Sequence, residues 1–152
     1  MGGSSVKKIL VIHGPNLNLL GKREPEIYGS VTIQKINQRL TALALTEKVT
    51  VDFFQSNHEG EIVTKIDASK GVYEAIVMNP AAYTHMGVAI RDAVSAVDVP
   101  VVEVHLSNIY AREEFRHHSL IAPVAKGQVA GFGAKSYELG FLAAISLLKS
   151  KK

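Results

Sequence analysis

The chain contains no cysteine and no long hydrophobic run, and each absence excludes a class of protein. Without cysteine, the 152 residues can form no disulfide, supply no thiolate nucleophile and bind no metal through sulfur. No stretch approaches the about 18 consecutive apolar residues of a transmembrane helix, and no signal-peptide pattern opens the sequence. We therefore expect a cytoplasmic protein with no membrane partner.

Strong charge of one sign is also missing. The formal net charge is only +3, and no basic run interleaved with aromatic residues appears. Nucleic acid is therefore not an expected partner, whereas a small anionic substrate fits the mild positive excess. The length and the lack of repeats or linkers predict one domain over residues 1–152, with 1–5 as a flexible lead.

The common motifs of nucleotide and metal sites are absent as well. The chain has neither G-x-G-x-x-G nor G-x-x-x-x-G-K-[ST], the two glycine-rich phosphate loops. It has no H-E-x-x-H, no H-x-H and no acidic cluster of suitable spacing, and the adjacent His117 and His118 would point to different faces. We expect no metal and no other cofactor.

What the sequence does contain is a regular alternation of strand-like and helix-like segments. Apolar runs of strand length occupy 6–12, 49–55, 72–78, 100–106 and 128–132. Helical periodicity follows in 33–43 (with Thr32 as N-cap), 62–66, 86–97 and 137–148, and 107–124 is less regular, with at most a short helix at 112–115. This order predicts an α/β, flavodoxin-like doubly wound fold, with a five-stranded parallel sheet between two helical layers.

That fold locates the chemistry, because ligands of open α/β sheets bind beyond the carboxyl ends of the strands. Each of the first four predicted strands is followed by a histidine, namely His13, His58, His85 and His105. Polar groups thus gather on one edge of the predicted sheet.

Acid/base chemistry without a cofactor fits these groups best. Glu103 and His105 alternate along a strand and so lie on the same side, where the carboxylate could orient the imidazole as a general acid. Taken alone, His105 could equally be a structural histidine. Ser107, Asn108 and Asn79 at neighbouring strand ends favour the functional interpretation.

The segment HGPNLNLLGKREPEIYGS, residues 13–30, is long for a connection in a compact domain. It could be a capped turn, but its cations Lys22 and Arg23 and its phenol Tyr28, held between prolines and glycines, favour an active-site lid. We expect such a lid to be mobile over about 22–28 when no ligand is bound.

Tyr28 could act as a base only as the phenolate. Lowering a tyrosine pKa from about 10 to about 7 needs roughly 4 kcal/mol, which one guanidinium about 4 Å away could supply. Arg23 on the same loop, or Arg112 or Arg116 after the fourth strand, could provide it, while the two glutamates of the loop would oppose it.

At this point the chain resembles the type II 3-dehydroquinate dehydratases, over about residues 8–149. The resemblance rests on GPNLNLLGKREPEIYG (14–29), FFQSNHEGE (53–61), NPAAYTH (79–85), IRDA (90–93) and EVHLSNIYAREEFR (103–116). It implies a flavodoxin-like subunit that forms trimers, four of them making a homododecamer. It also implies the dehydration of 3-dehydroquinate to 3-dehydroshikimate, in the shikimate pathway or in quinate catabolism, by anti elimination through an enolate without metal or Schiff base.

The same resemblance implies roles for individual residues. Tyr28 would remove the proton alpha to the ketone, with Arg23 holding the phenolate and the enolate-like transition state. His105 would protonate the departing C1 hydroxyl with Glu103 behind it, and Asn16 would position a water or donor near the enolate oxygen.

The implied substrate-binding residues lie on several loops. Substrate hydroxyls would be bound by Asn79, His85 and Arg116, and the carboxylate by Leu106 and Ser107. Arg112 would lie close to Tyr28, and Asp92 would reach the site from a neighbouring subunit.

Two departures from the family pattern are His13, where Asn is common, and Met86–Gly87 in place of small hydroxyl residues. They could alter loop packing or the start of a helix, and neither touches a residue with a role above. Two other functions stay open from the residues alone: a flavodoxin-like binder of nucleotide or flavin, and a purely structural oligomer subunit.

Overall fold

The protein is described here from a computed structural model, which covers residues 6–22, 24–28 and 30–149. Five parallel strands form one sheet in the order β2-β1-β3-β4-β5. The strands are β1 (Lys8–His13), β2 (Thr50–Gln55), β3 (Ala75–Asn79), β4 (Val101–His105) and β5 (Gly127–Ala130). This order confirms the predicted flavodoxin-like sheet.

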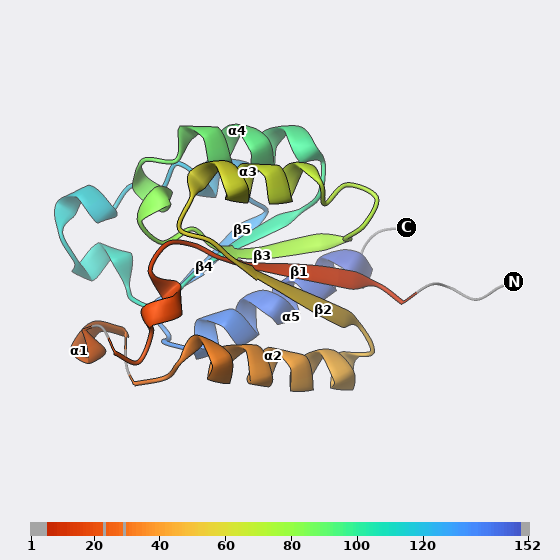
Figure 1. Ribbon diagram of the computed structural model, residues 1–152, viewed down its shortest axis with the longest axis horizontal. Helices are drawn as coiled ribbons and strands as arrows, with labels where there is room; N and C mark the ends of the chain where they lie inside the picture. Colours follow the sequence, from red (N-terminus) through yellow and green to blue (C-terminus); the bar gives the residue numbers. More distant parts are fainter. Residues whose placement is uncertain (1–5, 23, 29, 150–152) are drawn as a thin grey trace, which may run out of the picture.

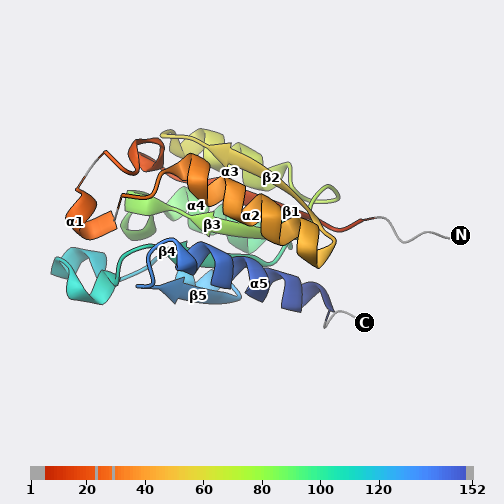
Figure 2. The same ribbon diagram turned by 90° about the horizontal axis from the view of Figure 1, so that it is seen from below.

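Helices cover both faces of the sheet, which gives three layers (Figure 1). One layer holds α2 (Ile33–Glu47) and α5 (Lys135–Lys149), and the other holds α3 (Glu59–Asp67) and α4 (Val88–Val97). The short helix α1 (Pro25–Tyr28) lies beyond the carboxyl ends of the strands, at the end of the molecule opposite both termini (Figures 1 and 2). No helix among the described residues is long and apolar enough to cross a membrane.

Side chains of each strand alternate between two hydrophobic cores. Ile9 and Val11 of β1 pack with α2 and α5, whereas Leu10 and Ile12 pack with α3 and α4. By the same alternation, polar residues at the strand ends face one helical layer or the other. The α2/α5 layer approaches the sheet closely. At Gly140 of α5 there is no room for a side chain, since an added Cβ would lie 2.3 Å from Val104 Cγ1.

Several predicted boundaries need correction. β1 and β3 begin two and three residues later than predicted, at Lys8 and Ala75. Val72 instead lies in a turn, where its backbone N–H donates to Ser69 O at 3.0 Å. Helix α4 begins at Val88, so the exposed Met86 precedes it. The N-cap prediction is confirmed, since Thr32 Oγ1 accepts from Lys35 N at 3.1 Å.

The irregular region between β4 and β5 also differs from expectation. Instead of a helix at 112–115, it contains three short 3-10 helices, η3 (Ile109–Ala111), η4 (Glu114–Arg116) and η5 (Ala122–Val124). Two more follow β1 and β3, namely η1 (Leu17–Leu19) and η2 (Ala81–His85). These tight turns bring loop side chains back over the ends of the strands.

Candidate active site

A pocket that is partly open to solvent lies at the carboxyl ends of β1, β3 and β4. Most of the predicted site residues that the structure describes line it. They are Asn16, Asn79, His85, His105, Leu106, Ser107, Arg112 and Arg116. The sheet topology therefore brings together residues that are up to 100 positions apart in the sequence.

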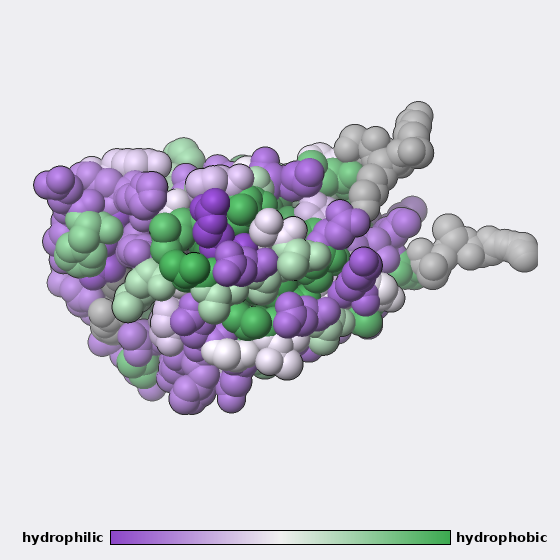
Figure 3. Space-filling model, turned by 90° about the horizontal axis from the view of Figure 1, so that it is seen from above, coloured by the Kyte–Doolittle hydropathy of each residue, from purple (hydrophilic) through white to green (hydrophobic). Residues whose placement is uncertain are grey.

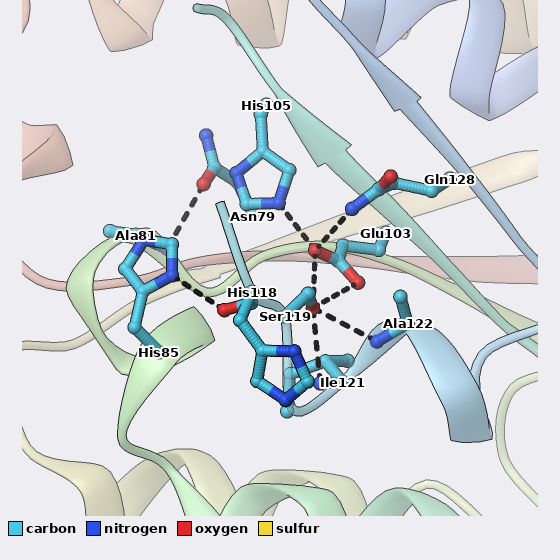
Figure 4. A network of polar contacts seen from close by, with 10 residues as sticks. All are labelled: Asn79, Ala81, His85, Glu103, His105, His118, Ser119, Ile121, Ala122 and Gln128. Carbon is cyan, nitrogen blue, oxygen red and sulfur yellow. Dashed lines mark hydrogen bonds and ion pairs between the residues drawn. The ribbon is translucent and has the colours of Figure 1, made fainter. Parts of the chain in front are cut away.

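Behind the pocket, Glu103 and His105 form the contact that their alternation predicted. Glu103 is fully buried, and its Oε2 lies 2.5 Å from His105 Nε2 (Figure 4). The same carboxylate accepts from Ser119 Oγ at 3.0 Å and from Gln128 Nε2 at 3.0 Å. Burial of a carboxylate is costly unless donors surround it, and this one has three donor side chains.

The contact fixes the tautomer of His105. A carboxylate oxygen only accepts, so Nε2 carries a hydrogen and the neutral ring presents Nδ1 as a lone pair. Nδ1 is therefore the ring atom through which His105 can exchange a proton with a group in the pocket.

Backbone geometry at β1 brings Asn16 to the pocket. A Cβ at Gly14 would lie 2.6 Å from Pro80 O, so only glycine lets the chain pass so close to the end of β3. Asn16 then adopts the left-handed region at φ 69°, and its N–H donates to Asn57 Oδ1 at 3.0 Å.

His85 approaches the pocket from η2. Its Nδ1 lies 2.9 Å from His118 O, and because a carbonyl only accepts, Nδ1 donates and Nε2 is left as an acceptor. Burial lowers the pKa of His85, which the bond to His118 O only partly offsets. The neutral ring can therefore accept a hydrogen bond from a group in the pocket.

Two guanidiniums supply positive charge at the mouth of the pocket. Arg116 Nε donates to Glu113 Oε1 at 2.8 Å, and Arg112 Nε lies 3.9 Å from the same oxygen. The pKa of the exposed Glu113 is lowered, first by its own backbone N–H and then by Arg116. Ile27 of α1 lines a second hollow with Arg112 and Arg116, so the opening loop packs against this region.

Besides Glu103, which lies behind the pocket, three predicted residues are not placed in its lining. Asp92 is exposed on α4 and does not line it. Arg23 lies outside the described residues, and of Tyr28 the structure describes only the backbone, as the last residue of α1. Among the described residues no three acidic or histidine side chains come together in a way that could hold a metal ion.

Sequence reasoning missed the residues that support the site. Ser119 lies in the irregular region, where no periodicity locates it. Gln128 had a signal, because β5 pairs with β4 and places it beside Glu103. His13, a departure expected to alter at most loop packing or the start of a helix, is buried, with both ring nitrogens hydrogen-bonded.

Comparison with known proteins agrees with this geometry. The family model described as "Dehydroquinase class II" matches residues 7–145. The chain belongs to the class II dehydroquinase family. Among curated relatives, a 3-dehydroquinate dehydratase of Acaryochloris marina is 61% identical over 94% of this chain and 96% of its own.

Solved structures of this family share the fold. A type II dehydroquinase from Butyrivibrio crossotus superposes with a TM-score of 0.88 at 44% identity, covering 97% of this chain and 100% of its own. One from Propionibacterium acnes gives 0.87 at 41% identity, covering 91% and 97%. The class II dehydroquinase fold is therefore present over nearly the whole chain.

Proposed function

We propose that the chain dehydrates 3-dehydroquinate to 3-dehydroshikimate without metal or Schiff base. Tyr28, as the phenolate, removes the proton alpha to the ketone and leaves an enolate. Protonated His105 then delivers a proton to the departing C1 hydroxyl, which leaves as water. The support from homology is membership of the class II dehydroquinase family and the similarity to 3-dehydroquinate dehydratases.

One observation carries the proposal. His105, oriented by the buried Glu103, lines the same pocket as Arg112 and Arg116. An acid with a fixed tautomer beside two guanidiniums suits an anionic substrate that must lose a hydroxyl group.

The remaining pocket residues would bind and position the substrate. Leu106 and Ser107 follow β4, where backbone N–H groups and the Ser107 hydroxyl can hold its carboxylate. Asn79 and His85 face its hydroxyl groups, and Asn16 orients a water or a donor near the enolate oxygen.

A Tyr28→Phe variant tests the mechanism. With 3-dehydroquinate as substrate, the ultraviolet absorbance of the conjugated enone should appear with wild-type protein and fall at least about 100-fold in rate for the variant, the usual range for loss of a general base. Tyr110→Phe is the matched control, since Tyr110 is exposed and outside the pocket. Wild-type rates for Tyr28→Phe would refute the base assignment.

The same assay separates the other functions. A structural subunit would give no turnover, and a flavin or nucleotide binder would show a characteristic absorbance after purification. Either result would contradict the proposed function.

We also propose that the active assembly is a trimer, four of which form a homododecamer, with Asp92 completing a neighbouring site. Hydrophobic side chains are exposed over the α3/α4 layer (Figure 3). At the N-terminal end of α4, Met86 and Val88 are 66% and 57% exposed. Asp92 is exposed on α4 too, so a subunit covering this face would contact it.

Mixed assemblies test that arrangement. Tyr28→Phe and Asp92→Asn should each be inactive alone, but co-expression should restore partial activity, because some sites then combine an intact Tyr28 with an intact Asp92. No recovery in mixed oligomers, verified by light scattering, would show that both residues act within one subunit.

A further inference from the structure

On the α2/α5 face, a buried chain of hydrogen bonds leads from the core to the pocket. His13 and Asn79 end the neighbouring strands β1 and β3 and are paired in register. They are 1% and 3% exposed, and Tyr137 of α5 is fully buried. Tyr137 OH is 2.9 Å from His13 Nδ1, and the Asn79 side chain faces the same hydroxyl, where it opposes the rise of the Tyr137 pKa.

The direction of each hydrogen bond in this series follows from its innermost partner, Asn37. His13 Nε2 lies 2.8 Å from Asn37 Oδ1, an amide oxygen that only accepts, so Nε2 carries the hydrogen. The neutral ring then has a lone pair on Nδ1, which accepts from the Tyr137 hydroxyl. Having used its one hydrogen, that hydroxyl accepts from Asn79 Nδ2.

The other end of the Asn79 amide is fixed independently. Asn79 Oδ1 accepts from Ala81 N at 3.0 Å. With Oδ1 on Ala81 and one Nδ2 hydrogen on Tyr137, the amide has a single orientation. The second Nδ2 hydrogen is then left for the pocket that Asn79 lines.

We propose that His13 is a positioning residue, which through Tyr137 sets the Asn79 amide so that it donates a hydrogen bond to an oxygen of the substrate. The inference deepens the proposed function and rests on it for the identity of that substrate. The inference concerns the direction of one hydrogen bond. Asn79 donates to an acceptor on the substrate, and His13 orients the Asn79 amide from the core without contacting the ligand.

The chain works only with a neutral His13. A protonated ring would donate from both nitrogens, so the Tyr137 hydroxyl would accept from His13 and its own hydrogen would compete with the Nδ2 hydrogen of Asn79. Burial lowers the pKa of His13 to about 4, although its bond to Asn37 opposes the shift, and burial also raises the pKa of Tyr137. Both groups are therefore neutral near pH 7.

Tyr137→Phe tests the link, because it removes the hydroxyl and keeps the ring in the core. We expect the KM for 3-dehydroquinate to rise about tenfold, the worth of one hydrogen bond. The kcat should change less, since a binding contact acts in ground and transition states alike. The matched control is Tyr73→Phe, a buried tyrosine before the opposite end of β3, whose hydroxyl donates to Asp52 Oδ2 at 2.6 Å.

A double-mutant cycle separates positioning from mere packing. His13→Leu should raise KM as Tyr137→Phe does, and His13→Gln, which can both donate and accept, should keep KM near the wild-type value. In an Asn79→Ala background, His13→Leu should leave KM unchanged, because nothing remains to be positioned. A similar KM increase in both backgrounds would overturn the proposal.

A crystal structure of the Tyr137→Phe variant makes the test independent of catalysis. The Asn79 amide should rotate away from its wild-type position, and in the Tyr73→Phe variant it should not. An unmoved amide in Tyr137→Phe would overturn the positioning role whether or not the protein turns over 3-dehydroquinate. Absence of wild-type turnover with a rotated amide would instead contradict the proposed function alone.

Discussion

On the α3/α4 face of the sheet, one buried carboxylate collects hydrogen bonds from His105, Ser119 and Gln128. On the α2/α5 face, His13, Tyr137 and Asn79 are linked in series. Both arrangements end at the same pocket, yet they hold their functional group differently.

In the first network three donors converge on one acceptor, whereas in the second each group is held by the one before it. Three donors on one acceptor tolerate the loss of a donor, because the others still compensate for burying the carboxylate. In a series of neutral groups each hydroxyl has only one hydrogen, so a break anywhere leaves the Asn79 side chain held only by Ala81 N. The α3/α4 network should therefore depend on its centre, and the α2/α5 network on every link.

Replacing the centre of the α3/α4 network should have the largest effect. Glu103→Gln puts an amide NH₂ among donors and removes the partner of the imidazolium. We expect kcat to fall about 10²–10³-fold, as for loss of general acid catalysis. Glu138→Gln is the control, because Glu138 pairs with Lys135 at the surface of α5. A loss of less than about threefold for Glu103→Gln would show that the carboxylate is not the centre of this network.

Acid should break the α2/α5 series selectively. The folded pKa of His13, about 4, lies below the unfolded value of 6.5, so the unfolded chain binds more protons between these limits. The free energy of unfolding should thus fall as the pH drops from 6.5 toward 4, by up to about 3 kcal/mol from this group.

Urea unfolding at several pH values measures this dependence. The His13→Gln variant should lose that part of the slope, whereas substitution of the exposed His58 by Gln should retain it. Equal slopes for wild type and His13→Gln would mean that His13 does not carry the acid sensitivity.

Loss of one donor on the α3/α4 face should have the smallest effect. Ser119→Ala removes a donor to Glu103 and the acceptor of Ile121 N and Ala122 N, and should destabilise the protein by about 1–2 kcal/mol. The kcat should fall less than tenfold, because His105 and Gln128 still bind the carboxylate. Ser146→Ala, at an exposed position of α5, is the control for both the urea midpoint and kcat. A fall in kcat as large as that of Glu103→Gln would show that the Glu103 carboxylate does not tolerate the loss of one donor.

The sequence predicted the parts of the site that depend on local periodicity. Alternation placed Glu103 and His105 on one side of a strand, and the order of strands and helices placed them at the functional edge. Ser119 could not be found in this way, because it reaches Glu103 from an irregular region whose path depends on tertiary packing. The short helix α1 within the predicted lid could not be found either, since a four-residue helix has no periodic signal.

His13 shows a different limit. Its position after an apolar strand indicated the functional edge, where a polar side chain is expected to meet ligand. Whether it faced the pocket or the core depended on where α5 sits, and α5 comes more than 120 residues later. Only the packed structure shows that it faces the core.

The close contact at Gly140 has a consequence for how this protein can vary. Tyr137 lies one turn before Gly140, so a side chain there would lift the helix from Val104 and carry the phenol with it. A single methyl group far from any ligand could in this way loosen the grip on substrate. The spacing between α5 and β4 is thus itself a determinant of how the pocket binds its substrate.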